Sequence, residues 1–117
     1  MGNYVYDLDV WKESHRLVLK VYKITMNFPP SEIYGLTSQF RRAAYSVPSN
    51  LAEGYRRRTI KERIHFYNIA LGSVEEAKYF SILSNDLQFI SDPDLFNEYN
   101  FLGKRLFAFI TAVQNKA

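Results

Sequence analysis

Apolar residues recur every three or four positions through most of this chain, and no stretch of useful length alternates with period two. The first spacing places apolar side chains on one face of an α-helix, whereas a half-buried strand requires alternation. The chain has no cysteine among its 117 residues, so neither disulfides nor thiolate metal sites can organise the fold. We therefore expect an all-α protein whose residues 1–117 form a single domain, long enough to bury a hydrophobic core.

Proline residues divide the helical pattern in its first half. One helix is expected over about residues 9–28, ahead of Pro29 and Pro30, and a second over about residues 37–57. Pro48 lies inside the apolar stripe of the second helix. Because the stripe continues in register on both sides of Pro48, we expect a kinked helix there and no break.

Capping residues define the second half. Thr59 followed by Glu62 forms a capping box, so a third helix should begin there and continue to about Ile90, which makes it the longest. Asp92 as N-cap and Pro93 at the first helical position predict the start of a fourth helix. The connections between the four helices are short, which favours an antiparallel, up-down four-helix bundle.

Two further features concern packing. Nine Tyr and nine Phe residues are more aromatic surface than four short helices readily bury, so we expect a homo-oligomer. The apolar residues outside the main stripes of the third and fourth helices are Ile69, Phe80, Leu83, Leu87, Ile90, Phe96, Phe101 and Phe107. Gly54 and Gly72 lie inside predicted helices, where glycine costs about 1 kcal/mol relative to alanine, and we attribute both to close helix packing.

Positive charge is concentrated in residues 41–63. This segment carries seven Lys and Arg residues against two Glu, a net charge of +5, while the whole chain is only +3. A local basic field attracts polyanions such as nucleic acid, and arginine can hold phosphate bidentately. The candidate nucleic-acid-binding residues are Arg41, Arg42, Arg56, Arg57, Arg58, Lys61 and Arg63, with Tyr45 and Tyr55 nearby as stacking surfaces. The alternative is a solvated charged face or a subunit interface, and Glu53 either pairs with Arg57 or orients an arginine for a ligand.

Other chemistry finds little support in the sequence. Glu62 and His65 have the spacing used in di-iron bundles, but His15 has Lys12 where a second such pair needs glutamate. No nucleophile elbow or glycine-rich phosphate loop is present, so we expect a protein that is not an enzyme and needs no metal or cofactor. No apolar span of 18 residues occurs, and we expect a cytoplasmic protein without a membrane partner.

Several strings of residues resemble a known family. They are Val10-Trp11, Phe28-Pro29, Tyr34-Gly35-Leu36-Thr37, the long motif from Gln39 to Gly54, and Gly72-Ser73 with Glu75-Glu76. Together they resemble the bacterial four-helix-bundle proteins encoded in intervening sequences of 23S ribosomal RNA genes. The resemblance extends to a related protein, the accessory variability determinant of diversity-generating retroelements, which forms a pentameric ring and associates with nucleic acid and a reverse transcriptase.

The resemblance implies a homo-oligomer, pentameric in form, that binds nucleic acid, with RNA as the expected class. Arg41 and Arg42 match the Arg-Arg position of the family, and the arginines after Gly54 match a region that is usually basic. The alternative function is a protein-interaction scaffold, or an accessory protein of a reverse transcriptase with no direct role in binding nucleic acid.

Overall fold

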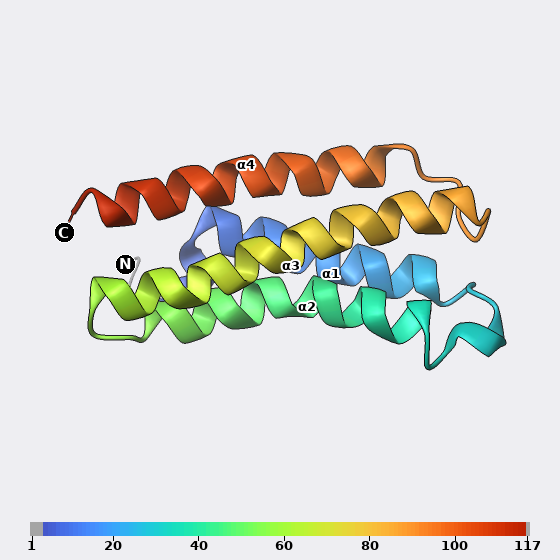
Figure 1. Cartoon of the computed structure of the whole chain (residues 1–117), viewed down its shortest axis with the longest axis horizontal. Coiled ribbons are helices and arrows are strands. Elements are labelled where there is room, and N and C mark those ends of the chain that lie inside the picture. Colours follow the sequence, from blue (N-terminus) through green and yellow to red (C-terminus); the bar gives the residue numbers. More distant parts are fainter. Residues whose placement is uncertain (1–3, 117) are drawn as a thin grey trace.

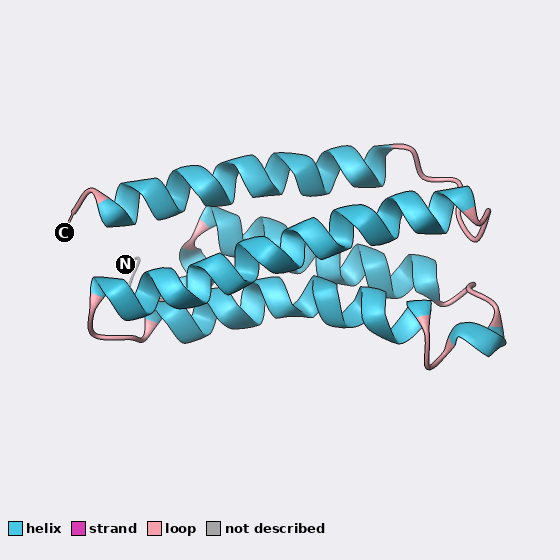
Figure 2. Cartoon of the chain, viewed as in Figure 1, coloured by secondary structure: helices cyan, strands magenta, loops and turns pink. Residues whose placement is uncertain are grey.

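The computed structural model describes residues 4–116, which form four long α-helices and two short 3-10 helices, with no strand in this part of the chain (Figure 2). The elements are η1 (Val5–Asp7), α1 (Asp9–Thr25), η2 (Pro30–Glu32), α2 (Leu36–Tyr55), α3 (Ile60–Asp86) and α4 (Asp94–Gln114). Successive long helices run back and forth along the bundle (Figure 1), so the α2–α3 turn lies at the same end as the last residues of α4. The predicted all-α four-helix fold is confirmed.

Thr59 caps the start of α3 as predicted, and Glu62 pairs with its hydroxyl. The backbone N–H of Glu62 donates to the Thr59 hydroxyl at 3.1 Å, and that hydroxyl donates to the Glu62 carboxylate at 2.9 Å. Helix α3 has 27 residues, more than any other element of the described chain, as predicted. Its first turn is fixed by local chemistry alone, which is why sequence could locate it.

Two predicted helix ends were wrong. Helix α1 ends at Thr25, and Phe28 belongs to a turn in which its N–H bonds the Thr25 carbonyl. Helix α3 ends at Asp86, four residues before Ile90. Gln88 there adopts a left-handed φ of 63°, and the N–H groups of residues 88 and 89 bond back to the carbonyls of residues 85 and 84. This is a Schellman ending, which glycine usually marks in a sequence and which glutamine does not.

Helix α2 continues through Pro48, which is buried. Proline has no N–H for the carbonyl of Ala44, so one rung of the helix is missing. The Trp11 indole N–H donates to the Pro48 carbonyl at 3.2 Å and ties α1 to this part of α2. The prediction that α2 does not break at Pro48 is confirmed, and the kink stays a prediction.

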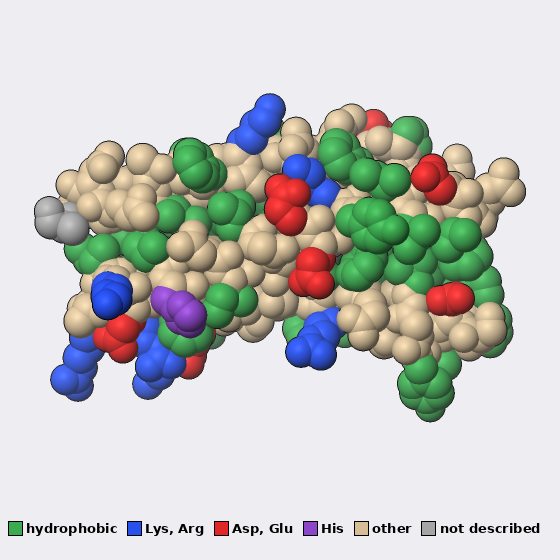
Figure 3. Space-filling model, in the orientation of Figure 1, with side chains coloured by type: hydrophobic (Ala, Val, Ile, Leu, Met, Phe, Trp, Pro, Cys, Tyr) green, Lys and Arg blue, Asp and Glu red, His purple; other side chains and the backbone are tan. Residues whose placement is uncertain are grey.

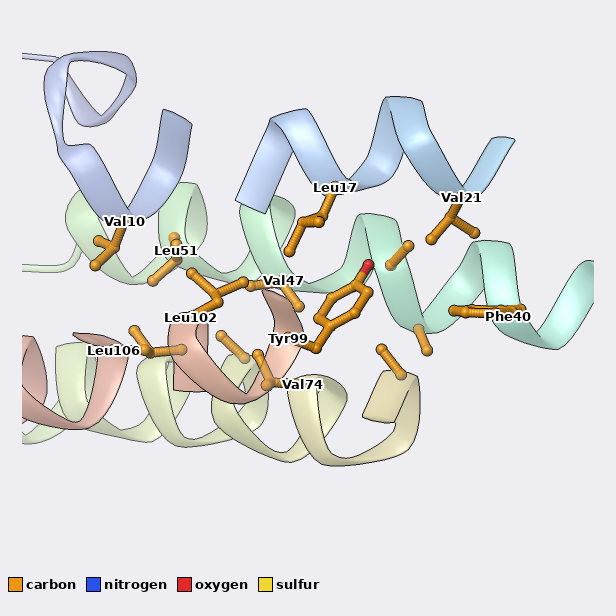
Figure 4. Packing of buried hydrophobic residues seen from close by; sticks show 14 of the residues in the cluster. Val10, Leu17, Val21, Phe40, Val47, Leu51, Val74, Tyr99, Leu102 and Leu106 are labelled. Carbon is orange, nitrogen blue, oxygen red and sulfur yellow. The ribbon is translucent and has the colours of Figure 1, made fainter. Parts of the chain in front are cut away.

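The core runs along the bundle axis between all four helices (Figure 4). Its largest fully buried side chains include Leu17 of α1, Phe40 of α2, Tyr67 of α3, and Tyr99 and Leu102 of α4. Buried positions repeat every three or four residues within each long helix. The stripes predicted for α2 and α4 form the core, whereas in α1 and α3 several predicted positions, such as Trp11 and Leu71, are half-buried, and Leu17 and Ala70 are buried in the core instead.

Gly54 and Gly72 differ in their surroundings. A Cβ on Gly54 would lie 2.7 Å from the Tyr67 ring, so glycine is required where α2 meets α3. A Cβ on Gly72 would meet no atom within 4 Å. Close packing therefore explains Gly54, and the same explanation was wrong for Gly72.

A polar network joins α1 to the start of α4. The Arg16 guanidinium bonds Glu98 at 2.7 Å and Glu13 at 2.6 Å, and the Lys20 ammonium bonds Glu98 and lies 3.2 Å from Asp92. The prediction that Asp92 caps α4 was wrong, because the Asp92 carboxylate pairs with Lys20. Helix α4 begins at Asp94, with Pro93 as the N-cap residue and no side-chain cap.

Burial alone would raise the pKa of the Glu98 carboxyl, but hydrogen bonds from Lys20 and Arg16 outweigh it, and the pKa is lowered. Burial would likewise lower the pKa of Lys20, yet its bonds to Glu98 and Asp92 raise it. Both shifts favour the charged forms, so the network is an ion cluster over a wide pH range.

No helix of the described chain combines the length and the apolar character that crossing a membrane requires.

Candidate nucleic-acid interface

The seven basic candidates lie in two groups on the structure. Arg41 and Arg42 are near the start of α2, and the other five surround the α2–α3 junction. Arg42 and Arg56 are 14 helical residues apart, which corresponds to about 21 Å. Figure 3 shows a concentration of Lys and Arg side chains at the junction end of the molecule. The basic segment is therefore continuous in sequence and divided in space.

The two adjacent arginines of α2 have different surroundings. The Arg41 Nε–H donates to the Thr25 hydroxyl at 2.8 Å, and its guanidinium lies 4.6 Å from the centre of the Tyr22 ring. These contacts fasten the start of α2 to the end of α1. Arg42 is exposed, because one residue along a helix is a rotation of about 100°.

Arg57 and Arg63 stabilise the α2–α3 junction. The Arg57 guanidinium bonds Glu53 at 2.7 Å and lies 4.7 Å from the centre of the Phe66 ring. The Arg63 Nε–H donates to the backbone carbonyl of Arg57 at 2.8 Å, beyond the last turn of α2. Cations suit this position because carbonyl groups at a helix C-terminus lack internal partners. Glu53 accordingly forms the ion pair expected from its spacing.

Three cations at the junction extend into solvent. The Arg56 side chain is 70% exposed, and its contact with Glu53 is long at 3.8 Å. Arg58 and Lys61 are exposed and form no ion pair within residues 4–116. Their charges are free to meet an external anion, while Arg57 and Arg63 hold the backbone beneath them.

One further cation joins this end from a distant part of the sequence. Lys116, just after α4, lines a hollow at the end of the bundle together with Arg63 and Tyr67. Burial raises the pKa of the Tyr67 hydroxyl and outweighs the opposing charge of Arg63, so this phenol stays neutral. Sequence reasoning could not find Lys116 because it lies 53 residues after Arg63.

The carboxylate and imidazole of the Glu62–His65 pair serve other contacts. Glu62 is part of the capping box, and the His65 ring packs edge-on against Phe66 at 5.2 Å between centroids. Across residues 4–116, no three His, Asp or Glu side chains converge as metal ligands would.

Sequence reasoning missed a second cluster near the junction, in which the Trp11 ring contacts both Tyr6 and His15 beside Tyr45. The spacing of Trp11 and His15 at i and i+4 is the one signal for it, because those positions share a helix face.

The structure is an all-helical four-helix bundle with a basic turn between the second and third long helices. The family described as 23S rRNA-intervening sequence protein matches residues 6–108, and the chain belongs to this family. No curated protein matches the chain in a sequence comparison.

Proposed function

We propose that this protein is a non-enzymatic, homo-oligomeric bundle that binds nucleic acid electrostatically, with RNA as the expected class. The observation that carries the proposal is the set of exposed cations at the α2–α3 junction, Arg56, Arg58 and Lys61. Within residues 4–116, Arg58 and Lys61 form no ion pair and Arg56 has only the 3.8 Å contact with Glu53, so phosphate binding there would break no strong internal contact. Membership of the 23S rRNA-intervening sequence protein family makes RNA the first ligand to test.

The junction is also suited to hold its cations in fixed places. Arg57 and Arg63 stabilise the turn through a 2.7 Å contact with Glu53 and a 2.8 Å hydrogen bond to the Arg57 carbonyl, respectively. A rigid backbone reduces the entropy lost on binding, although the long side chains still lose rotamer freedom. Such contacts position a phosphate backbone and carry little sequence information.

The test is the salt dependence of binding to a single-stranded RNA, measured by mobility shift. Each phosphate contact contributes about 0.7 to the slope of log affinity against log salt for single strands. A variant with Arg56→Gln, Arg58→Gln and Lys61→Gln should keep the fold, since glutamine is a good helix former. Loss of three contacts should reduce the slope by about 2.

The matched control removes three exposed lysines from other surfaces. Lys12→Gln, Lys23→Gln and Lys104→Gln together change the net charge by the same amount. This control should retain most of the slope. Equal losses in the two triple variants would mean that only net charge matters, and the junction would not be the site. If the wild-type protein binds no RNA even at low salt, the results favour a scaffold for a reverse transcriptase or another protein.

Exposed apolar side chains support self-association. Ile69, Tyr79 and Ile82 are exposed on α3, and Leu87 is exposed directly after it. Figure 3 shows apolar surface gathered over the C-terminal half of this helix, away from the basic end. Phe80, Leu83 and Ile90, by contrast, are half-buried against the core. On α4, Phe101 and Phe107 are exposed and Phe96 is half-buried.

Light scattering tests the assembly directly. Five copies of the 13.7 kDa chain would have a mass of about 69 kDa. Ile82→Lys should reduce the measured mass by placing a charge in the interface, whereas Leu19→Lys, at an exposed apolar position on α1, should not. A wild-type protein that is monodisperse at the mass of one chain would rule out the ring.

A further inference from the structure

A groove lined by aromatic rings lies between the N-terminal part of the chain and the exposed side of α2. Its lining residues are Tyr6, Trp11, His15, Val18, Tyr45, Pro48, Ser49 and Ala52. Two of the rings show much of their surface to solvent, with Tyr6 56% exposed and Tyr45 47% exposed. Exposed aromatic faces gathered in one groove are a feature of binding surfaces.

Contacts within the groove fix the rings in place. The Trp11 indole is anchored to α2 by its hydrogen bond to the Pro48 carbonyl. The His15 ring stacks on the indole at 5.1 Å with an angle of 17° between the planes, and the Tyr6 ring meets it edge-on at 4.9 Å. Three rings of the groove, those of Tyr6, Trp11 and His15, are therefore held in fixed orientations before a ligand binds.

The groove leads to the basic junction. A neighbouring hollow shares Tyr6, Ser49 and Ala52 with it and extends to Arg56. On α2, Tyr45 and Arg56 share one face because residues 45, 49, 52 and 56 are spaced by four, three and four. The rise of the helix places Tyr45 and Arg56 about 16 Å apart. A bound linear polymer could thus lie across the aromatic rings and bring its backbone to the guanidinium of Arg56.

Single-stranded nucleic acid fits this arrangement better than a duplex does. Each unpaired base offers a flat face, and stacking on an aromatic side chain contributes about 1–3 kcal/mol per base. In a duplex the base faces are stacked on each other, so only phosphates and groove edges remain accessible. A proline-rich peptide can also bind in an aromatic groove, but its uncharged backbone would not pair with Arg56.

We propose that the groove beside Tyr6, Trp11, His15 and Tyr45 binds unpaired bases of a single strand, whose phosphates reach Arg56. This inference rests on the proposed nucleic-acid binding and specifies its substrate as single-stranded. Stacking should be tolerant of sequence, because every base has an aromatic face.

Trp11 is the one tryptophan in the chain, so its fluorescence reports on the groove directly. The probe is an oligouridylate of about 12 nucleotides, within the usual range of single-strand sites, used alone and annealed to its complement. We expect the single strand to quench Trp11 and to bind at least about tenfold more tightly than the duplex, which corresponds to one stacked base.

Tyr45→Leu keeps an apolar side chain of good helix propensity and removes the aromatic face. It should weaken single-strand binding about tenfold and leave duplex binding unchanged. The matched control is Tyr34→Leu, at a tyrosine that is 93% exposed outside the groove, and it should leave both affinities unchanged. Tyr6→Leu is a second groove variant with the same expected loss, and circular dichroism checks that each variant folds.

The outcomes separate the two proposals. No binding of either probe at low salt contradicts nucleic-acid binding itself. Equal affinity for single strand and duplex, with unchanged Trp11 fluorescence and full affinity in both groove variants, leaves electrostatic binding intact and overturns the groove. Quenching by a proline-rich peptide but not by oligouridylate would also overturn it, in favour of a protein ligand.

Discussion

Replacing Tyr99 by phenylalanine is expected to stabilise the bundle by about 1–2 kcal/mol. The Tyr99 side chain is fully buried, and its hydroxyl has no hydrogen-bond partner within residues 4–116. Figure 4 shows this hydroxyl pointing toward α1, and burial raises its pKa, so it stays a neutral phenol. A buried hydroxyl without a partner costs about 1–3 kcal/mol, and phenylalanine removes that cost while the ring still fills the core.

A small void opposes this gain. The space left by one oxygen is about 10–15 Å³, and at about 24 cal/mol per Å³ it costs roughly 0.3 kcal/mol. For a chain of this length, 1 kcal/mol corresponds to a shift in Tm of about 4 °C, so Tyr99→Phe should raise Tm by about 4–8 °C. Urea unfolding should show a higher midpoint with an unchanged m-value.

Two serines of α3 provide a matched control for the same reasoning. Ser81 and Ser84 are both fully buried, but only Ser81 has a partner, the carbonyl of Lys78 at 2.8 Å. Ser84→Ala should therefore stabilise the protein more than Ser81→Ala does. If Tyr99→Phe lowers stability by more than about 0.5 kcal/mol, the Tyr99 hydroxyl must have a partner such as a water molecule and is not an unpaired donor.

Four other substitutions test the packing, the end of α3 and the ion network. Gly54→Ala should destabilise the protein by about 1–2 kcal/mol, because a Cβ would lie 2.7 Å from the Tyr67 ring. Gly72→Ala should stabilise it by about 1 kcal/mol. If thermal unfolding shows Gly54→Ala to be more stable than Gly72→Ala, the close contact at Gly54 is contradicted. Gln88→Gly should add about 0.5–1 kcal/mol in urea unfolding by relieving the left-handed φ of 63°, and a loss would mean that this side chain makes a needed contact. Because the pKa of Glu98 is lowered, the stability that this carboxylate contributes is complete above its ordinary pKa of about 4.5 and is lost as pH falls through the lowered pKa. Glu98→Gln should therefore cost about 1 kcal/mol at pH 7 and weaken the pH dependence of stability below 4.5. An unchanged loss of stability in acid would contradict this role of Glu98.

The helices themselves were predictable wherever local chemistry fixes them. Asp9 begins α1 and Thr59 caps α3 as expected, because the apolar period and the capping box act over a few residues. The ends of α1 and α3 were not predicted correctly. The Schellman motif at Gln88 lacks the glycine by which such a helix end is usually predicted. The loop after it is held by two hydrogen bonds between the Asn85 side chain and the backbone of Asp92.

The candidate site was predictable in composition and not in arrangement. Arg56 and Arg57 are adjacent and chemically identical, yet one extends into solvent and the other bonds Glu53 and covers Phe66. Trp11 fits the core stripe of α1 in sequence, but the structure leaves it half-buried in the groove beside Tyr45. In each case the exposure of the side chain depends on which helix packs beside it.

The sequence by itself determined the fold class, the number of helices, most of the core and the local excess of positive charge. These follow from spacings of three and four residues and from charge counts, which need no knowledge of distant parts of the chain. Only the tertiary structure decided that Arg41 bonds Thr25 while Arg42 stays exposed, and that Lys116 joins the basic end. The physical reason is that exposure depends on neighbours brought together by helix packing, and those neighbours lie tens of residues away in the sequence.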